Sequence, residues 1–179
     1  KSSLISLIVA FAGIATYITF RYDRRYAFLA LVALAHDVVI VCGVFAWFGL
    51  LLQLEVDSLF AVALLTIAGY SVNDTVVVFD RVRENLRRYK SYEQREILNM
   101  SLNETLSRTV MTSVTTGLAL LAIVLFGGAV LRDFALAMMW GVLIGTYSSV
   151  FVAVGMLGFF DLKKSFDEDD DPGAVTDED

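Results

Sequence analysis

Two carboxylic acids lie inside long apolar segments of this sequence, where ionised groups are rare. Asp37 follows the only histidine, His36, within residues 26–52, and Asp74 lies within residues 58–79. Placing an Asp at the centre of a membrane helix costs about 2.5–3.5 kcal/mol on insertion scales. Such a group needs a charged partner, a water-filled cavity or a proton. A carboxyl group that changes between its charged and neutral forms with its surroundings is what proton coupling requires.

Asp74 is the stronger of the two candidates because polar groups surround it in the sequence. Its neighbours include Tyr70, Ser71 and Asn73. Arg108, Thr112 and Thr116 follow at four-residue spacing at the start of the next apolar segment, which places them on one helix face. If the two helices are neighbours, Arg108 can reach Asp74. A working carboxylate is favoured over a structural ion pair at Asp74, whereas Arg108 is either its functional partner or a plain interfacial charge.

His36 and Asp37 form a secondary candidate near the middle of their apolar segment. Histidine changes charge near neutral pH more readily than any other side chain, so the pair suits a proton pathway. A buried pair that satisfies its own polar groups, or those of a neighbouring helix, is the favoured interpretation.

Small residues recur at four-residue spacing in the last apolar segment. Gly141, Gly145 and Ser149 form one stripe along a helix. Such stripes are typical of helices that pack closely inside membranes, so we interpret this one as structural.

Nothing in the sequence favours an enzyme. A single cysteine, Cys42, and a single histidine are too few for a metal site or a disulfide, and no cofactor is expected. Intramembrane aspartyl proteases also use two membrane aspartates, but neither Asp37 nor Asp74 follows the Gly-x-Gly pattern of that class. No catalytic residue is therefore predicted.

The composition indicates a membrane protein. Of the 179 residues, 57% are hydrophobic, and the mean hydropathy is +0.67. This is more apolar surface than a soluble fold of this size buries. Five uncharged or nearly uncharged segments reach about the 20 residues that a membrane-spanning helix needs. They are residues 2–20, 26–52, 58–79, 109–126 and 134–160. The predicted fold class is an all-α, polytopic transmembrane helix bundle over residues 1–160.

The basic residues predict an orientation for this bundle. Twelve of the fourteen Lys and Arg residues lie in alternate connections or in the C-terminal tail. By the positive-inside rule these parts are cytoplasmic. Residue 1 is then on the outer side, which for an uncleaved chain most simply means that a further span precedes it.

Two polar segments fall on the predicted cytoplasmic side. Residues 80–108 form an amphipathic loop that is helical in part, with a capping box at Ser91-x-x-Gln94. A helix on the membrane surface is favoured here over a docking surface for a cytoplasmic partner. Residues 161–179 hold nine of the twenty acidic residues and are predicted to be a disordered tail. Without this tail the chain is nearly neutral, so no nucleic acid is expected as a partner.

Three long motifs in order resemble the SecF family of protein-export membrane proteins. GYSVNDTVVVFDRVRENLRRY at residues 69–89 resembles the end of the family's fourth membrane helix. SLNETLSRTVMTSVTT at residues 101–116 resembles the start of its fifth helix, and FGGAVLRDFALAMMWGVLIGTYSSVFVA at residues 126–153 its last loop and sixth helix. The Ala-His-Asp step at residues 35–37 is similar to the family as well. The match covers about residues 2–160 without a gap.

This resemblance implies an architecture and a function. The family has six spans with a periplasmic domain between the first two, so the chain corresponds to half of a resistance–nodulation–division-type membrane domain from its second span on. It implies a multi-pass protein of the bacterial inner membrane, with residue 1 periplasmic. With SecD, it would use the proton-motive force to assist the SecYEG channel. YajC and the exported polypeptide are further implied partners, besides the lipid bilayer.

The resemblance also implies site residues. The Asp of the family's VND motif and the Arg of its LSRT motif are implicated in proton transport, and these positions are Asp74 and Arg108 here. Asn73, Tyr70, Thr112 and Thr116 would be the supporting polar groups. Two other functions stay open: a proton-coupled small-molecule exporter of the same superfamily, and a purely structural subunit. Both H⁺ and Na⁺ remain open as the coupling ion.

Overall fold

The computed structural model describes residues 2–52, 58–160 and 162. The predicted outer loop after the second span, residues 53–57, lies outside the described residues. So does the predicted tail, with the exception of Leu162.

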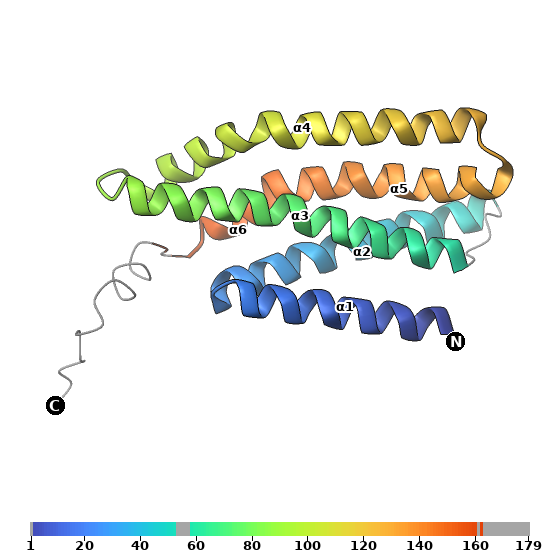
Figure 1. Cartoon of the computed structure of the whole chain (residues 1–179), viewed down its shortest axis with the longest axis horizontal. Coiled ribbons are helices and arrows are strands. Elements are labelled where there is room, and N and C mark those ends of the chain that lie inside the picture. Colours follow the sequence, from blue (N-terminus) through green and yellow to red (C-terminus); the bar gives the residue numbers. More distant parts are fainter. Residues whose placement is uncertain (1, 53–57, 161, 163–179) are drawn as a thin grey trace.

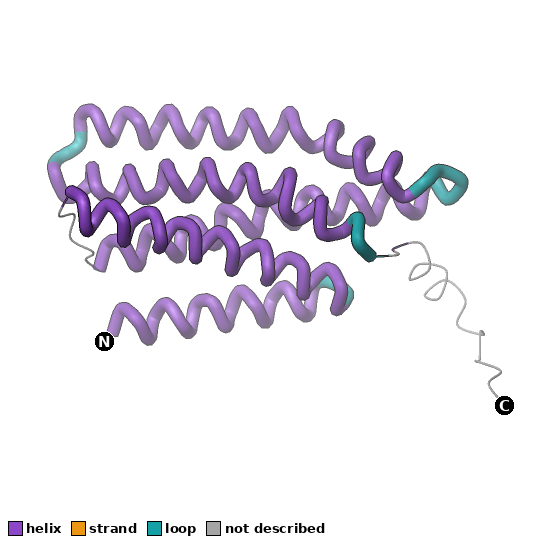
Figure 2. Tube along the Cα trace, turned by 180° about the vertical axis from the view of Figure 1, so that it is seen from behind, coloured by secondary structure: helices purple, strands orange, loops and turns teal. Residues whose placement is uncertain are grey.

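In the described part of the chain, five long helices run side by side in alternating directions (Figure 1, Figure 2). They are α1 (Ser2–Arg21), α2 (Arg24–Leu52), α3 (Ser58–Arg88), α4 (Gln94–Phe126) and α5 (Ala129–Tyr147), the last continued by the π-helical segment η1 (Ser148–Ala153) and α6 (Val154–Leu157). No strand occurs among the described residues, so the predicted all-α fold class is confirmed.

Four of these helices are long and apolar enough to cross a membrane. They cover residues Arg24–Leu51, Ser58–Arg88, Gln94–Phe126 and Ala129–Leu157. The apolar part of the first helix, Ile5–Arg21, is shorter than the other four. The structure thus supports a multi-pass membrane bundle.

The segment 80–108 differs from the predicted surface loop. It continues α3 and α4 beyond their apolar parts, and only the turn between Arg88 and Gln94 is not helical. Apolar side chains on the two extensions explain this: Val82 and Leu86 of α3 share one core cluster with Ile97 and Leu98 of α4. The two extensions therefore pack against the bundle and do not form a separate helix on the membrane surface.

The start of α4 is capped two residues later than the Ser91 pattern predicts. Glu93 is the N-cap residue, and its backbone N–H donates to Glu96 Oε2 at 3.4 Å. Glu93 and Glu96 form a capping box, in which the side chain of each residue accepts a hydrogen bond from the backbone N–H of the other. A Glu–Glu pair can build it, although the usual sequence pattern begins with Ser or Thr.

Helix α3 lies at the centre of the bundle and contacts α1, α2, α4 and α5. Helix α4 lies at its edge, at the top of Figure 1. Only 11% of the most apolar stretch of α4 is buried, against 56% for α3 and for Ala129–Leu157. Most of the α4 surface is therefore left for lipid or for another protein.

Buried apolar residues form two core clusters along the bundle. One contains Leu34 of α2 and Ala68 of α3, and the other contains Val41 of α2 and Ile67 of α3. Asp37 lies between Leu34 and Val41 in the sequence, so the polar side chains described next lie where the two clusters meet.

Candidate functional site

Asp37 is fully buried and has partners on both carboxylate oxygens. Its Oδ1 is 3.0 Å from Nδ1 of the neighbouring His36, and its Oδ2 accepts a short hydrogen bond from the hydroxyl of Ser71. His36 remains one-third exposed. The predicted His36–Asp37 pair is thus present in the structure, and it also reaches a hydroxyl on α3.

Three hydroxyl-bearing residues extend this polar layer from α3 toward η1. Thr75 Oγ1 and Ser149 Oγ lie 3.0 Å apart, and Ser149 Oγ also lies 3.5 Å from the backbone oxygen of Ser71. All three side chains are buried. Asp37, Ser71, Ser149 and Thr75 together are called the hydroxyl layer below. This layer joins three helices through polar contacts inside an apolar bundle.

The glycine stripe allows α5 to approach α3 closely at this level. A Cβ atom on Gly145 would lie 3.1 Å from Cβ of Ser71, and one on Gly141 would overlap the side chain of Ile67. Ser149, the third member of the stripe, makes the contact with Thr75. The stripe is therefore directed at α3 within this chain.

The π-helical segment η1 begins where the stripe reaches the hydroxyl layer. A π-helical turn contains one more residue than an α-helical turn, and such turns often occur at functional sites. Here the widened turn includes Ser148 and Ser149, both fully buried. The Ser148 hydroxyl has no hydrogen-bond partner among the described residues. No pattern in the sequence predicts this segment.

Asp74 is buried, with 5% of its surface exposed, and its Oδ2 has no hydrogen-bond partner in the described part of the chain. It lies on α3 between Ser71 and Thr75 but belongs to neither of their hydrogen bonds. Burial without a partner strongly disfavours a charged carboxylate. The structure therefore presents Asp74 as a buried acid with one unsatisfied carboxylate oxygen.

Arg108 is exposed and makes no ion pair with Asp74 among the described residues. Arg108 instead lines a cavity of about 350 Å³ at the arginine-rich end of the bundle. The other lining residues are Val77, Asp80, Arg81, Glu84, Glu104 and Thr105. Val77 lies three residues after Asp74, so the cavity ends about one helical turn from the buried acid.

The polar residues predicted to support Asp74 fall into different surroundings. Tyr70 places its hydroxyl 3.3 Å from Ser113 Oγ on α4, and Ser113 Oγ lies 2.6 Å from Thr146 Oγ1 on α5. Asn73 is exposed. The structure therefore joins Tyr70 to α4 and α5, and it directs Asn73 away from the interior.

Among the described residues, the two threonines below Arg108 make no hydrogen bond to Asp74. Thr112 is exposed and donates to backbone oxygens of its own helix, at 2.9 Å to Thr109 and 3.1 Å to Arg108. Thr116 is half-buried. Sequence reasoning missed Thr146 and Ser148, whose only signal is a polar side chain within an apolar segment.

A polar network ties the extensions of α3 and α4 together beside the cavity. Arg81 donates to Glu104 and to Glu84, each at 2.6 Å. The amide of buried Asn85 donates to Ser101 Oγ at 3.0 Å and to Glu104 Oε2 at 2.8 Å. The wall of the cavity is thus fixed by both charged and buried polar contacts. Within the described residues, no three His, Cys, Asp or Glu side chains gather as a metal site.

The sequence matches known export proteins over nearly its whole length. Residues 1–163 match the family described as "Protein export membrane protein SecD/SecF, C-terminal". The chain is 51% identical over 157 residues to the protein translocase subunit SecF of Prochlorococcus marinus, covering 88% of this chain and 49% of that protein.

Two further SecF relatives give the same result. The Rhodobacter capsulatus subunit is 51% identical over 165 residues, covering 92% of this chain and 48% of the relative, and that of Synechocystis is 49% identical over 153 residues, covering 86% and 49%. The chain spans about half the length of these relatives. With matches of this extent, the chain belongs to the SecD/SecF family of protein export membrane proteins.

Proposed function

We propose that this chain is the membrane part of a SecF-type subunit that uses a proton gradient to assist polypeptide export. Its relatives are named protein translocase subunits, which supports a role in moving polypeptides across a membrane. Under this proposal SecD is the partner that completes the membrane domain. The SecYEG channel and YajC are neighbours in the same machinery, in the bacterial inner membrane with the arginine-rich end cytoplasmic.

The observation that carries the proposal is the isolated acid Asp74. It is buried, one carboxylate oxygen has no partner, and the cavity beside Arg108 ends about one turn away. A carboxyl group in such a position is stable when it carries a proton. It can release that proton when water or a positive charge approaches from the cavity. Asp74 is therefore suited to carry one proton per cycle.

Arg108 supplies the charge that favours release in this scheme. In the described geometry it lines the cavity, which ends about one helical turn from Asp74. A small movement of α4 against α3 would change that separation and so change the stability of the Asp74 carboxylate. Because α4 is the least buried of the four long apolar helices, such a movement disturbs few packed side chains.

The outward face of α4 supports an assembly with a second half-bundle. Arg108, Thr112 and Thr115 are exposed on a helix whose surroundings would otherwise be lipid. The threonines satisfy their hydroxyls on their own backbone, whereas the guanidinium of Arg108 needs water or an anionic partner. SecD would cover this face and enclose the proton path between the two halves.

The test is the Asp74→Asn substitution in the intact protein together with SecD. Asn has nearly the same shape as Asp and can hydrogen-bond, so the protein should insert and assemble. It cannot exchange a proton, so the response to a proton gradient should be lost. Release of a secreted polypeptide from membrane vesicles, with and without the gradient, measures this. The matched control is Asp133→Asn, because Asp133 is an exposed acid on α5 that does not line the cavity beside Arg108.

The alternatives give different results in the same assay. Full gradient response in Asp74→Asn vesicles would overturn the proton-carrier role and favour a structural subunit. A response to a sodium gradient in place of a proton gradient would identify the other ion. A loss of small-molecule efflux without any change in polypeptide release would favour the exporter.

A further inference from the structure

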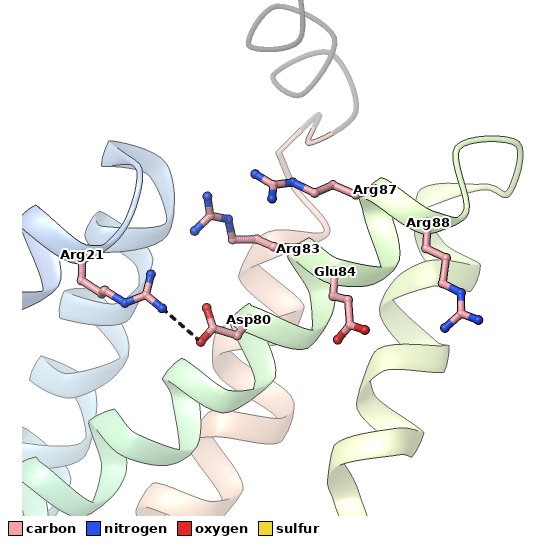
Figure 3. A pocket seen from close by; sticks show the side chains of 6 residues that line it. All are labelled: Arg21, Asp80, Arg83, Glu84, Arg87 and Arg88. Atoms are coloured by element: carbon pink, nitrogen blue, oxygen red, sulfur yellow. Dashed lines mark ion pairs between the residues drawn. The ribbon is translucent and has the colours of Figure 1, made fainter.

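A second cavity, of about 590 Å³, lies at the arginine-rich end of the bundle, where the end of α1 meets the last turns of α3 (Figure 3). It is lined by Arg21, Asp80, Arg83, Glu84, Arg87 and Arg88, and it is called the arginine pocket below. The proton pathway proposed above uses Asp74 and Arg108, neither of which lines this pocket. The proposed proton pathway therefore does not explain the arginine pocket.

The carboxylates of the pocket are already engaged by arginines. Asp80 lies 3.8 Å from Arg21, and Glu84 accepts a hydrogen bond of 2.6 Å from Arg81, which lies outside the pocket. The lining thus contains four guanidinium groups and two carboxylates. The pocket carries an excess of positive charge that suits an anion.

Arg83 has donor capacity that the described residues do not use. It pairs with Asp23 at 3.1 Å through one terminal nitrogen, and its guanidinium lies 5.8 Å from the ring centre of Tyr26. Its Nε is buried and has no hydrogen-bond partner in the described part of the chain. A buried N–H group is normally paired, so this atom indicates a missing acceptor. Guanidinium groups match the oxygens of phosphate especially well.

Three of the arginines face a common region. Figure 3 shows Arg83 and Arg87 extending from α3 toward the side on which Arg21 projects from α1, whereas Arg88 points away from them. An anion between α1 and α3 could therefore receive hydrogen bonds from two helices. A volume of this size is typical of pockets for small molecules.

The surface of α1 beside the pocket is apolar and exposed. Phe20, immediately before Arg21, is 89% exposed, and Tyr17, one turn earlier, is 58% exposed. Arginines at the end of a membrane helix lie at the level of lipid headgroups, with aromatic side chains just below them. A ligand that combines a phosphate with a hydrocarbon chain fits both features. Basic pockets between membrane helices are a known type of site for anionic headgroups.

We propose that the arginine pocket binds the phosphate of an anionic phospholipid, whose acyl chains lie along the exposed apolar side of α1. The phosphate is held between Arg21, Arg83 and Arg87. Because the pocket joins α1 to the outer part of α3, the bound lipid links the first helix of the chain to the central one.

The test measures phosphatidylglycerol retained by the intact protein, using native mass spectrometry after purification with equal amounts of phosphatidylglycerol and phosphatidylcholine. The wild type should retain phosphatidylglycerol preferentially. The double variant Arg21→Gln/Arg87→Gln should retain it about twenty-five-fold less, because each arginine that reaches the phosphate contributes roughly a fivefold gain in affinity. The matched control is Arg24→Gln/Arg95→Gln, which removes two exposed arginines that do not line the pocket. Its retention should equal that of the wild type.

Equal retention in the wild type and in Arg21→Gln/Arg87→Gln would overturn the proposal. The source of the phosphate is tested with inorganic phosphate at millimolar concentration, which should not displace the lipid. Displacement by inorganic phosphate would show a site for the free ion and would also overturn the proposal. So would phosphatidylglycerol retention that appears only after removal of residues 163–179, because the acidic segment would then be the occupant.

Discussion

Ser71 on α3 donates its hydroxyl hydrogen to the carboxylate of Asp37 on α2, in a bond that is buried in the apolar interior of the bundle. Inside a membrane protein neither group has bulk water as an alternative partner. The bond therefore fixes how α2 and α3 face each other at the level of the hydroxyl layer.

Replacing Ser71 by Ala should destabilise the protein by about 1–3 kcal/mol, because it leaves a buried carboxylate oxygen without its donor. The measurement is the unfolding midpoint of the purified protein in detergent. Thr66→Ala is the control, since the Thr66 hydroxyl is exposed and donates only to Val62 of its own helix at 2.8 Å. If both substitutions change the midpoint equally, the Ser71–Asp37 bond does not hold the helices together.

Adding a methyl group to Gly141 should also destabilise the bundle. The new Cβ would overlap Ile67, and overfilling of a packed interior costs about 1–3 kcal/mol. Gly117→Ala is the matched control, since no atom lies within 4 Å of its added Cβ. Protease resistance in detergent distinguishes the two variants. Shortening Ile67 to Ala should partly restore Gly141→Ala, and failure to do so would mean that the contact is not the cause.

A larger substitution at Gly145, in the same glycine stripe, should have a stronger effect. Leu at this position would have to enter the space beside Ser71, where even a Cβ lies 3.1 Å from its neighbour. We expect Gly145→Leu to weaken helix packing more than Gly141→Ala and to disturb the adjoining hydroxyl layer. Protease digestion of the intact protein in membranes measures this, and wild-type resistance would contradict it.

Most of the bundle could be predicted from the sequence because apolar length determines which segments can cross a membrane. The interior position of Asp74 was predicted from its polar neighbours, and the His36–Asp37 contact from adjacency. The continuation of α3 and α4 through residues 80–108 was not predicted. Charged residues there suggested a surface segment, whereas Val82 and Ile97 carry the helices on by packing against the core.

The hydroxyl layer is harder to predict because it depends on helix rotation. Ser149 was identified for its small size, which suits close packing, and that same property brings its hydroxyl to Thr75. The π-helical turn at Ser148–Ala153 depends on backbone hydrogen bonds that no residue type specifies. It contains two consecutive serines, Ser148 and Ser149, that are both fully buried.

The network between the extensions of α3 and α4 permits a direct comparison of a buried and an exposed contact. Asn85→Ala should cost about 1–3 kcal/mol because it removes a buried amide that donates to both Ser101 and Glu104. Arg81→Ala should cost only about 0–1 kcal/mol, since water screens its partly exposed ion pairs. Unfolding midpoints at low and high salt test this, and only the Arg81 effect should depend on salt. If Arg81→Ala costs more stability than Asn85→Ala, the α3–α4 connection is stabilised mainly by its ion pairs.

The last prediction concerns the charge beside the proposed proton pathway. Arg108→Leu should leave the fold intact, because Arg108 is exposed and has no ion pair among the described residues. Without this charge the Asp74 carboxylate loses a neighbour that favours it, so proton release toward the arginine-rich end should require a higher pH. The gradient-driven release of polypeptide should therefore shift to a higher pH on the side of the arginine-rich end.

Membrane vesicles with the internal side accessible allow that pH to be set directly. Arg108→Lys should restore most of the wild-type profile, because a lysine in this position keeps the positive charge. Arg95→Gln, an exposed arginine at the start of the same helix, should not change the profile. If Arg108→Leu lowers activity equally at every pH, the arginine acts through contacts other than the charge on Asp74, and the proposed release step is wrong.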